Sequence, residues 1–429
     1  MPSASPPSRR RCASSAAGSR RPASSSATTG ARSRSAMAPP RTRVALAGRS
    51  TELLPLLDRL QALADAHSLA VAAVATQDQR DPALRAALER LSPAPEVCLR
   101  TEEVLTSIGA DVFIVASPLV QRHAHVRAAL ASGCHVLAAA PLALTVRAAA
   151  GCVAAAEAAG RALAVYDSGR FSLDVHMLKW ATGSGIIGDP AYVLDIAFGA
   201  EETSPNLCAR GDPALHERLR GGGLLLARAV HDCALLRFAV NDIVEVSGHE
   251  ACLEPERIAR GPDGRVRARF ACSAADTIAA QFRFANGAAG VYTRSWAGRG
   301  TTLPHRRTVW ATRGAVDNDA LFLDTGARRS LQEEWKAHVT PVEVERLFPR
   351  AVTDPLALEL SSFFAALARW DRGLQTAMPH HGREALRDLA TAWAIAESGA
   401  RGRRLAVQEV ESLAAEDAQR DLNAHIKAG

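Results

Sequence analysis

The sequence predicts an α/β protein with two sheets: an N-terminal doubly wound parallel sheet, then a C-terminal α/β domain with a large open, mostly antiparallel sheet. Up to about residue 165, short apolar runs alternate with segments of helical period, which is the pattern of parallel strands joined by helices. Beyond that point, strands follow one another through hairpin turns. The 429 residues also exceed what one hydrophobic core usually fills, so two domains are expected.

The alternation is clearest between residues 111 and 167. Apolar runs typical of strands buried on both faces lie at 111–117, 135–140 and 162–167. Helical spacing is found between them, at 121–132 and after Thr145, which can cap the second of these helices. Gly133 and Gly160 follow the two helices, where left-handed C-terminal caps are expected.

Three further strands and helices precede this block. The expected strands are 43–48, 69–76 and 96–100, and the expected helices are 53–63, 81–91 and 101–109. Asp81 and Pro82 form a clear helix start, because Asp caps the first turn and proline suits the first helical position. Proline is costly further inside a helix, so the first helix is expected to start only at Pro55.

Six strands alternating with helices predict a Rossmann dinucleotide-binding domain, but its phosphate fingerprint is incomplete. In G-x-G-x-x-G at the first turn, glycines let the backbone approach a pyrophosphate. The chain reads G-R-S-T-E-L from Gly48, so only the first glycine is present. Ser50 still permits some approach, whereas Leu53 is expected to push the helix off the sheet. Glu52 is unfavourable beside phosphates, and Arg49 offsets it in part.

The acidic residue that holds the adenine ribose in such domains is missing from its usual place. Thr76 stands at the end of the second strand, and Asp78 follows two residues later. Asp78 is therefore either a ribose ligand or a solvated loop aspartate, and both interpretations stay open.

The second part of the chain is dominated by strands. They are expected at 191–200, 243–252, 265–273, 277–285, 288–296, 307–311 and 320–324. Asn286-Gly287 is a tight hairpin turn, and residues 201–220 are polar and loop-like. Helices return at 355–370 and 383–399. Successive strands joined by hairpins predict an open antiparallel sheet with helices on one face.

His231 lies in an apolar helix that follows Gly221-Gly222-Gly223. It is either a core histidine or a catalytic group, and the glycines favour the second because they permit close approach to a ligand. Asp232 points to another face of the helix, whereas Arg228, one turn earlier, shares the His231 face. Arg170, just after the sixth strand, is either a ligand for an anionic or polyhydroxylated group or part of a surface salt bridge.

Residues 1–36 are not expected to belong to the folded part. They are mostly Ser, Ala, Pro and Arg, with seven Arg and no Asp or Glu, and cannot bury enough apolar surface to offset their ordering entropy. They are either an organellar transit peptide or a start assigned too early, with Met37 as the true start. The chain's preference for Arg over Lys favours the second, because it indicates a biased genome.

Charge and cysteine usage exclude several classes of function. Without the seven Arg of the tail, 44 basic residues face 45 acidic ones, a net charge of −1 in place of +6. The folded part therefore shows no preference for nucleic acid or an anionic membrane. Eight scattered cysteines without a C-x-x-C pair predict neither a disulfide framework nor a metal site, and indicate a reducing cytoplasm. No apolar run reaches membrane-spanning length.

Several short segments together resemble the Gfo/Idh/MocA family of NAD(P)-dependent oxidoreductases, which act mostly on sugars and cyclitols. The resemblance covers nearly all of residues 43–407, and it rests on the order and spacing of the segments. They are DVFIVASP, AALASGCHVL…PLA, GRF, SGIIGDP, GGG…H, FRFANGAAG, VWATRGAV and ALRDLATAWAIAESGARGRRLAV.

The resemblance implies a fold, a cofactor and partners. It implies an N-terminal Rossmann domain whose NAD or NADP lies at the carboxyl ends of the strands, facing the open sheet of the second domain. The implied cofactor-binding positions are Gly48, Arg49, Ser50, Asp78, Ser117, Pro118 and Pro141. The implied substrate-binding positions are Arg170 and Arg228, and the implied substrate is a small polyhydroxylated molecule. Family members commonly form dimers or tetramers through the exposed face of the C-terminal sheet.

The family's catalytic motifs are only partly present. Its E-K-P falls on Ala139-Ala140-Pro141, so the lysine is absent, and no other lysine occurs in the first domain. Its D-x-x-x-H keeps the histidine as His231, but Ala227 stands at the Asp position. Oxidation of a carbinol needs a general base, and His231 alone could serve. Each missing group is expected to cost about 10²–10⁴-fold in rate, not additively.

Two hypotheses of different class follow. The first is an oxidoreductase that transfers a hydride between NAD(P) and a sugar, cyclitol or related polyol, with His231 as acid and base. The second is a catalytically degenerate relative that acts as a binding or assembly module. In either case we expect residues 1–40 as a tail, 41–165 as the Rossmann domain, 166–407 as the substrate and oligomerisation domain, and 408–429 as a loosely attached C-terminal tail.

Overall fold

The computed structural model describes residues 41–199, 213–260, 263, 265–297, 301–374 and 378–428. The predictions for residues 1–36, and for residues 201–212 of the polar segment, lie outside these ranges.

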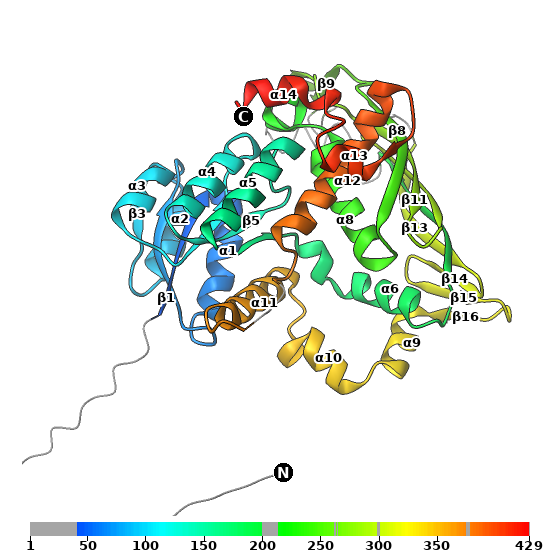
Figure 1. The fold of residues 1–429 in the computed structure, drawn as a ribbon, viewed down its shortest axis with the longest axis horizontal. Helices are drawn as coiled ribbons and strands as arrows, with labels where there is room; N and C mark the ends of the chain where they lie inside the picture. The colour runs from blue at the N-terminus through cyan, green and yellow to red at the C-terminus, as the bar shows by residue number, and fades with distance from the viewer. Residues whose placement is uncertain are drawn as a thin grey trace, which may run out of the picture. The chain divides into compact units, whose positions relative to one another are not determined.

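Six parallel strands form the first sheet, in the order β3-β2-β1-β4-β5-β6 (Figure 1). The strands are β1 (Thr42–Gly48), β2 (Leu69–Ala75), β3 (Glu96–Cys98), β4 (Val112–Ala116), β5 (His135–Ala139) and β6 (Leu163–Tyr166). The helices between them are α1 (Ser50–Leu63), α2 (Pro82–Glu89), α3 (Thr101–Ser107), α4 (Leu119–Ala131) and α5 (Val146–Ala159). This is the doubly wound Rossmann topology, so the prediction from alternating strands and helices is confirmed.

Local signals in the sequence mark several helix ends correctly. The side chains of Asp81 and Thr145 accept hydrogen bonds from the first turns of α2 and α5. Gly133 and Gly160 follow α4 and α5 with φ of +85° and +59°, which is the left-handed conformation that glycine adopts without a Cβ penalty.

Helix α1 departs from its prediction, because it begins at Ser50 and contains Pro55. The proline removes only one hydrogen bond in the second turn. The N-terminus of the helix is stabilised in return by the carboxylate of Asp78, which accepts the Ser50 N–H at 2.8 Å. Leu53 is fully buried in the core under α1, so the sheet accommodates a large side chain where the fingerprint has glycine.

The second sheet has nine strands, in the order β16-β15-β14-β13-β7-β12-β11-β8-β17. They are β7 (Pro190–Phe198), β8 (Ile243–Ala251), β11 (Thr277–Phe284), β12 (Ala289–Ser295), β13 (Leu303–Ala311), β14 (Gly314–Asp317), β15 (Ala320–Leu323), β16 (Arg328–Ser330) and β17 (Leu405–Ala406). Only the β12–β7 pair is parallel, so the predicted open, mostly antiparallel sheet is confirmed. The strand predicted at 265–273 lies elsewhere: β10 (Val266–Ala271) pairs with β9 (Glu256–Arg260) in a separate ribbon.

Three helices lie between the first domain and the second sheet (Figure 1): α6 (Leu173–Gly183), α8 (Val230–Ala239) and α12 (Gly382–Arg401). Helix α12 contacts α5 of the first domain and β8 of the second sheet, so it joins the two parts. Helix α11 (Pro355–Trp370) returns to the first domain, where Phe363 and Phe364 are buried in one cluster with Val44 of β1. Helices α11 and α12 were predicted, whereas α6, α9 (Leu331–His338) and α10 (Pro341–Leu347) were not.

The C-terminal segment is fixed to both domains, so the expectation of loose attachment is wrong. It comprises α13 (Val407–Glu411), the 3₁₀ turn η6 (Asp417–Gln419) and α14 (Arg420–His425). Gln419 is fully buried; its Oε1 accepts the Val146 N–H at 2.7 Å, and its Nε2 donates to Glu397 at 3.0 Å. One polar side chain thus joins the start of α5 to α12, a contact that composition alone does not reveal.

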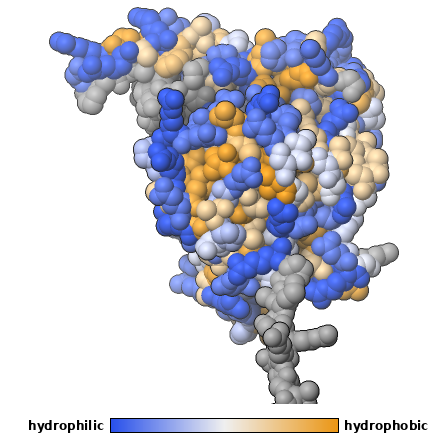
Figure 2. Space-filling model, turned by 90° about the vertical axis from the view of Figure 1, so that its left-hand side faces the viewer, coloured by the Kyte–Doolittle hydropathy of each residue, from blue (hydrophilic) through white to orange (hydrophobic). Residues whose placement is uncertain are grey.

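The side of the molecule that carries the first domain has hydrophobic residues at its centre, within a border of hydrophilic ones (Figure 2). Strand β3 belongs to this domain and forms one edge of its sheet. Val97 in β3 and Leu99 just after it are 40% and 57% exposed.

Candidate active site

His231 has a carboxylate partner that the sequence analysis did not assign. Its Nδ1 lies 2.8 Å from Oδ2 of Asp167, the residue directly after β6. The Asp167 side chain is 11% exposed and that of His231 is 32% exposed. The expectation that His231 works without an aspartate is therefore wrong: Ala227 leaves a gap on the helix, and the first sheet supplies the acid from another direction. A His–Asp pair of this kind fixes the tautomer and orientation of the imidazole.

Each member of the pair shifts the other's pKa toward the charged form. Burial raises the pKa of Asp167, but the charge of His231 and its hydrogen bond outweigh this and hold the pKa at about 2. Burial lowers the pKa of His231, yet the Asp167 carboxylate raises it above the usual value. A histidine that gains a proton readily and remains partly exposed can act as an acid or a base near neutral pH.

The backbone around Asp167 is held in place from α11. The Asp167 N–H donates to Oε1 of Glu359 at 2.8 Å, and the Arg170 N–H donates to the Asp167 carbonyl at 3.0 Å. Burial raises the pKa of Glu359 well above its usual value, because a buried carboxylate is penalised. The Glu359 carboxyl group thus supports the backbone of Asp167, while the Asp167 side chain pairs with His231.

Asp232, the next residue on α8, faces the second sheet. It accepts a hydrogen bond from the Tyr292 hydroxyl at 2.9 Å and one from Nε of Arg294 at 3.2 Å. Arg294 and Arg307 also pair with the buried carboxylate of Asp195. The prediction that Asp232 does not serve His231 agrees with this geometry.

The charges of Arg170 and Arg228 both act on the pair: Arg170 lowers the pKa of Asp167, and Arg228 that of His231. Arg170 belongs to the 3₁₀ turn η1 (Ser168–Phe171), and its guanidinium lies 3.5 Å from Glu384 and 3.9 Å from Asp388. Its side chain is only 13% exposed and that of Asp388 is 3% exposed, whereas that of Glu384 is 41% exposed, so these contacts run from an interior network to the surface. Arg228 is half-buried in the π-helical turn η4 (Leu225–Ala229), and its charge lowers the pKa of His231.

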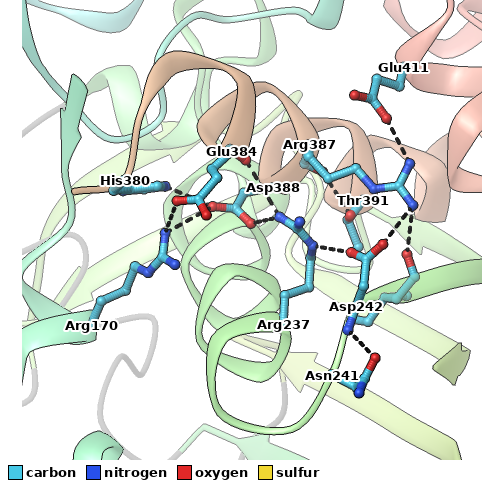
Figure 3. Close-up of polar contacts among 11 residues, drawn as sticks. Arg170, Arg237, Asn241, Asp242, His380, Glu384, Arg387, Asp388, Thr391 and Glu411 are labelled. Atoms are coloured by element: carbon cyan, nitrogen blue, oxygen red, sulfur yellow. Dashed lines mark hydrogen bonds and ion pairs between the residues drawn. The ribbon is translucent and has the colours of Figure 1, made fainter. Parts of the chain in front are cut away.

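The network around Arg170 ties α8 to α12 (Figure 3). Asp388 of α12 pairs with Arg237 of α8 and lies 2.8 Å from Nε2 of His380. Arg237 and Arg387 both pair with Asp242, at the start of β8. The helix that carries His231 is thereby fixed to the helix that joins the two domains.

A separate cleft of about 740 Å³ runs along the carboxyl ends of β1, β2 and β4. Five of the predicted cofactor positions line it: Gly48, Arg49, Asp78, Ser117 and Pro118. Ser50 and Pro141 do not line it, although the Ser50 N–H holds Asp78 and the Pro141 carbonyl accepts a bond from Arg122, which does line it. Ligands of doubly wound sheets bind at this edge.

Glycines bring two chain segments close at this cleft. A Cβ on Gly48 would lie 3.0 Å from Cβ of Ala116, so this glycine lets β1 and β4 approach each other. Gly221, which has φ of +83°, lines the opposite wall, where a Cβ would lie 2.9 Å from the Leu119 side chain. Gly221, the first residue of the glycine triplet, therefore contributes to the wall of the cleft from the second domain. The sequence predicted only that the triplet permits close approach to a ligand.

Arg122 was missed, and it lies at the same edge. Its guanidinium donates to the carbonyl oxygens of Ser117, Ala139 and Pro141 at 2.7–3.2 Å. Helix α4 was predicted, but no local pattern shows that one of its arginines points inward. Asp167 carried a better signal, because it directly follows a buried parallel strand, at the edge where functional side chains gather.

The residues of the cleft fit a nicotinamide dinucleotide. The volume is in the range of binding pockets for molecules of this class. Arg49, Arg100 and Arg220 line its walls as groups for phosphates, and Asp78 supplies a carboxylate for ribose hydroxyls. Asp78 also caps α1, so the interpretation of a merely solvated loop residue does not describe it fully.

In the described ranges, no group of three or more His, Cys, Asp and Glu side chains is arranged to hold a metal ion. No helix within them combines the length and the apolar composition needed to cross a bilayer.

Two family models match the chain. One is described as an oxidoreductase family with an NAD-binding Rossmann fold and matches residues 43–167; the other is the GFO/IDH/MocA C-terminal domain and matches residues 175–317. None of the curated proteins compared by sequence is a match.

Several solved structures share the fold along most of the chain. An oxidoreductase from Agrobacterium radiobacter in complex with NAD⁺, L-tartaric acid and magnesium is 18% identical, with a TM-score of 0.65, over 86% of this chain and 99% of that one. The WlbA dehydrogenase from Bordetella pertussis in complex with NADH and UDP-GlcNAcA is 19% identical, with a TM-score of 0.65, over 85% and 98%. A super-repressor mutant of Gal80p from Saccharomyces cerevisiae is 15% identical, with a TM-score of 0.69, over 86% and 99%.

The two domains that the sequence predicted, their sheet topologies and the two matching family models lead to one conclusion: this chain belongs to the Gfo/Idh/MocA family of oxidoreductases, with an NAD-binding Rossmann domain at its N-terminal end.

Proposed function

We propose that the protein is an NAD(P)-dependent oxidoreductase that acts on a CH–OH group of a sugar, cyclitol or related polyol, with His231 as acid and base. The observation that carries this proposal is the 2.8 Å contact between His231 and Asp167. It places an oriented, partly exposed histidine at the carboxyl edge of a sheet of the dinucleotide-binding type.

His231 would take the hydroxyl proton of the substrate during oxidation and return it during reduction. Asp167 would stabilise the imidazolium that forms, because a carboxylate on Nδ1 favours the charged ring. A bound nicotinamide would accept or supply the hydride. Arg49, Arg100 and Arg220 would hold the phosphates, and Asp78 the ribose hydroxyls, in the cleft that they line.

The lost lysine is the main departure from the family pattern. The Ala140 side chain cannot donate a hydrogen bond or carry a charge, so substrate positioning falls on other groups. Arg228, whose charge is felt by His231, is the proposed substrate ligand. Arg170, the other predicted substrate ligand, already lies 3.5 Å from Glu384 and 3.9 Å from Asp388, so we give it a positioning role in this proposal. Its proposed role is to hold the Asp167 loop.

The proposed substrate class is supported by similar proteins, and the proposed assembly by one surface of this chain. L-tartaric acid and UDP-GlcNAcA are bound in two of the similar structures, which supports a small hydroxylated substrate here.

The outer face of the second sheet exposes Tyr192, Trp310 and Phe322 by 38–40%. We propose that this face forms a homo-oligomer, a dimer or tetramer, and that the protein acts in the cytoplasm.

The test is a screen of the full chain for oxidation of sugars, cyclitols and sugar acids with NAD⁺ and NADP⁺, followed by variants on one active substrate. His231→Ala is expected to abolish turnover while the dinucleotide still binds. Asp167→Asn is expected to lower kcat by about 10²–10⁴-fold. His249→Ala, which removes an exposed histidine from β8, is the control and should retain activity. Undiminished turnover in His231→Ala would refute the assignment.

A catalytically degenerate member that acts as a binding or assembly module is the second candidate. Ala140 and the incomplete glycine motif favour it, and a repressor protein, Gal80p, shares the fold at a TM-score of 0.69. The two candidates differ in one respect that is easy to measure. A module that binds dinucleotide but turns over no substrate in the screen would support the second.

A further inference from the structure

One short segment of the second domain contributes to the wall of the dinucleotide cleft. Ala214, Leu215, Arg220 and Gly221 line the cleft together with residues that follow β1, β2 and β4. Arg220 is the charged residue among these four. Its guanidinium lies 3.6 Å from Glu217, and the two side chains are 53% and 46% exposed. Arg220 is therefore the group with which this segment can reach a phosphate of a bound dinucleotide.

The backbone of this segment is compact, which fixes where Arg220 lies. Arg220 ends the 3₁₀ turn η3 (Arg218–Arg220), and the glycine triplet follows directly. The Gly221 N–H donates to the Arg218 carbonyl at 3.0 Å, which closes the turn. A Cβ on Gly222 would lie 2.3 Å from the Ala214 carbonyl oxygen, so the two ends of the segment pack directly against each other. A shift of Arg218 would therefore move Arg220 as well.

Arg218 anchors the turn, and its partners lie in the C-terminal segment and in β8. Its Nε donates to Oδ2 of Asp421 in α14 at 3.0 Å, and its Nη1 donates to Oε1 of Glu250 in β8 at 3.2 Å. Its Nη2 donates to the carbonyl of Ala418 in η6. The Arg218 side chain is 27% exposed and that of Glu250 is 18% exposed, so these contacts are partly shielded from salt.

The C-terminal segment also contacts the first domain, at the start of α5. There Gln419 accepts the Val146 N–H, and Nε of Arg147 donates to Oε2 of Glu416 at 3.0 Å. Helix α5 packs against α4, whose first residues line the cleft. The segment is thus fixed to the first domain, and it holds the second-domain wall of the cleft through Arg218.

We propose that Arg220 is a second-domain ligand of the dinucleotide phosphates, and that Arg218 is a positioning residue through which the C-terminal segment sets the affinity for the dinucleotide. The inference rests on the proposed function. A guanidinium presents several donors that match phosphate oxygens. The exposed contact of Arg220 with Glu217 is weak, so it can give way to a phosphate. Because the turn is already held in place, less entropy is lost when Arg220 binds.

The test is calorimetric titration of the full chain with NAD⁺, NADH, NADP⁺ and NADPH, and then of variants with the dinucleotide that binds most tightly. Arg220→Gln is expected to raise Kd about tenfold, because one charge-assisted contact is lost. Arg218→Gln is expected to raise Kd by a similar or smaller factor. Arg420→Gln removes an arginine that is 80% exposed from the same C-terminal segment. It is the matched control, with an unchanged Kd.

A double variant separates positioning from an independent effect of Arg218. If Arg218 acts through Arg220, its substitution adds little once Arg220 is gone. The Kd of the variant that carries both Arg218→Gln and Arg220→Gln should then be close to that of Arg220→Gln alone. Losses that multiply in the double variant would overturn the positioning role.

A wild-type Kd in Arg220→Gln, or in folded Arg218→Gln, would also overturn the inference. If Arg218→Gln fails to fold, Asp421→Ala takes its place, because it removes the carboxylate contacts of Arg218 and leaves Glu250 as a partner. An unchanged Kd in Asp421→Ala would overturn the inference in the same way. Failure of the wild type to bind any of the four dinucleotides would overturn the proposed function itself, so the two failures are distinguishable.

Discussion

His231 was found from its sequence context, whereas its partner required the structure. The glycine triplet before an apolar helix favoured a catalytic role for this histidine, beside the alternative of a core residue. Asp167 lies 64 residues away, and only the packing of α8 against the end of β6 brings the two side chains together. The gap at Ala227 suggested a weakened acid–base group, but Asp167 brings a carboxylate to the histidine from the first domain.

The protonation of His231 gives a direct prediction at this scale. In the wild type, Asp167 raises its pKa above the usual 6.5. In Asp167→Asn the hydrogen bond remains but the charge is lost, so burial dominates and the pKa should fall below 6.5. NMR titration of ¹³C-labelled histidine checks this, with His231→Ala to assign the resonance. A pKa unchanged in Asp167→Asn would show that the pair is not electrostatically coupled.

The same pair makes stability depend on pH, with a sign for each member. The raised pKa of His231 adds stability that is fully present below about pH 6.5 and is lost as pH rises through the folded-state value. The pKa of Asp167, lowered to about 2, adds stability above about pH 4 that is lost as pH falls toward 2. Urea unfolding of wild type and Asp167→Asn should therefore differ most between about pH 4 and 6.5; the difference should disappear toward pH 2 and become smaller as pH rises through the folded-state pKa of His231.

At the scale of elements, the contact between α8 and α12 depends on one carboxylate. Asp388 pairs with Arg237 and His380, and all three side chains are mostly buried. Removing one partner of a buried pair typically costs about 3–5 kcal/mol, because the other charge stays buried. Asp388→Asn is expected to lower the free energy of unfolding by about 3 kcal/mol, measured by urea denaturation.

An exposed pair is the control for this prediction. Glu256 and Arg269 lie in the β9–β10 ribbon with side chains more than half exposed, so Glu256→Gln should cost less than about 1 kcal/mol. Equal effects of the two substitutions would show that the network in Figure 3 does not hold the helices together.

Secondary structure was predictable where the period of the pattern was regular. The parallel strands read as continuous apolar runs because both of their faces are buried, and α11 shows a complete apolar stripe. Helix α10 has no buried residue, so it has no stripe to detect. Helix α1 was misplaced because the rule for Pro55 is local, whereas the cap from Asp78 comes from the loop after the next strand.

At the scale of the whole molecule, the order of elements predicted the architecture well. The strand order of the first sheet is the one expected for alternating strands and helices. In the second sheet, the hairpins predict most of the pairs of neighbouring strands. The contacts that join the domains could not be predicted. Gln419, Asp388 and Asp167 each act across more than 60 residues or between domains, and no periodicity records such pairs.

Dinucleotide binding is the property on which the whole account depends. Thermal unfolding of the full chain should be measured with and without NAD⁺, NADH, NADP⁺ and NADPH. A ligand at about 100 times its dissociation constant adds about 2.7 kcal/mol, which corresponds to a rise of several degrees in Tm for domains of this size. We expect such a rise with at least one dinucleotide. No rise with any of the four at millimolar concentration would contradict the account and leave the fold as a binding module.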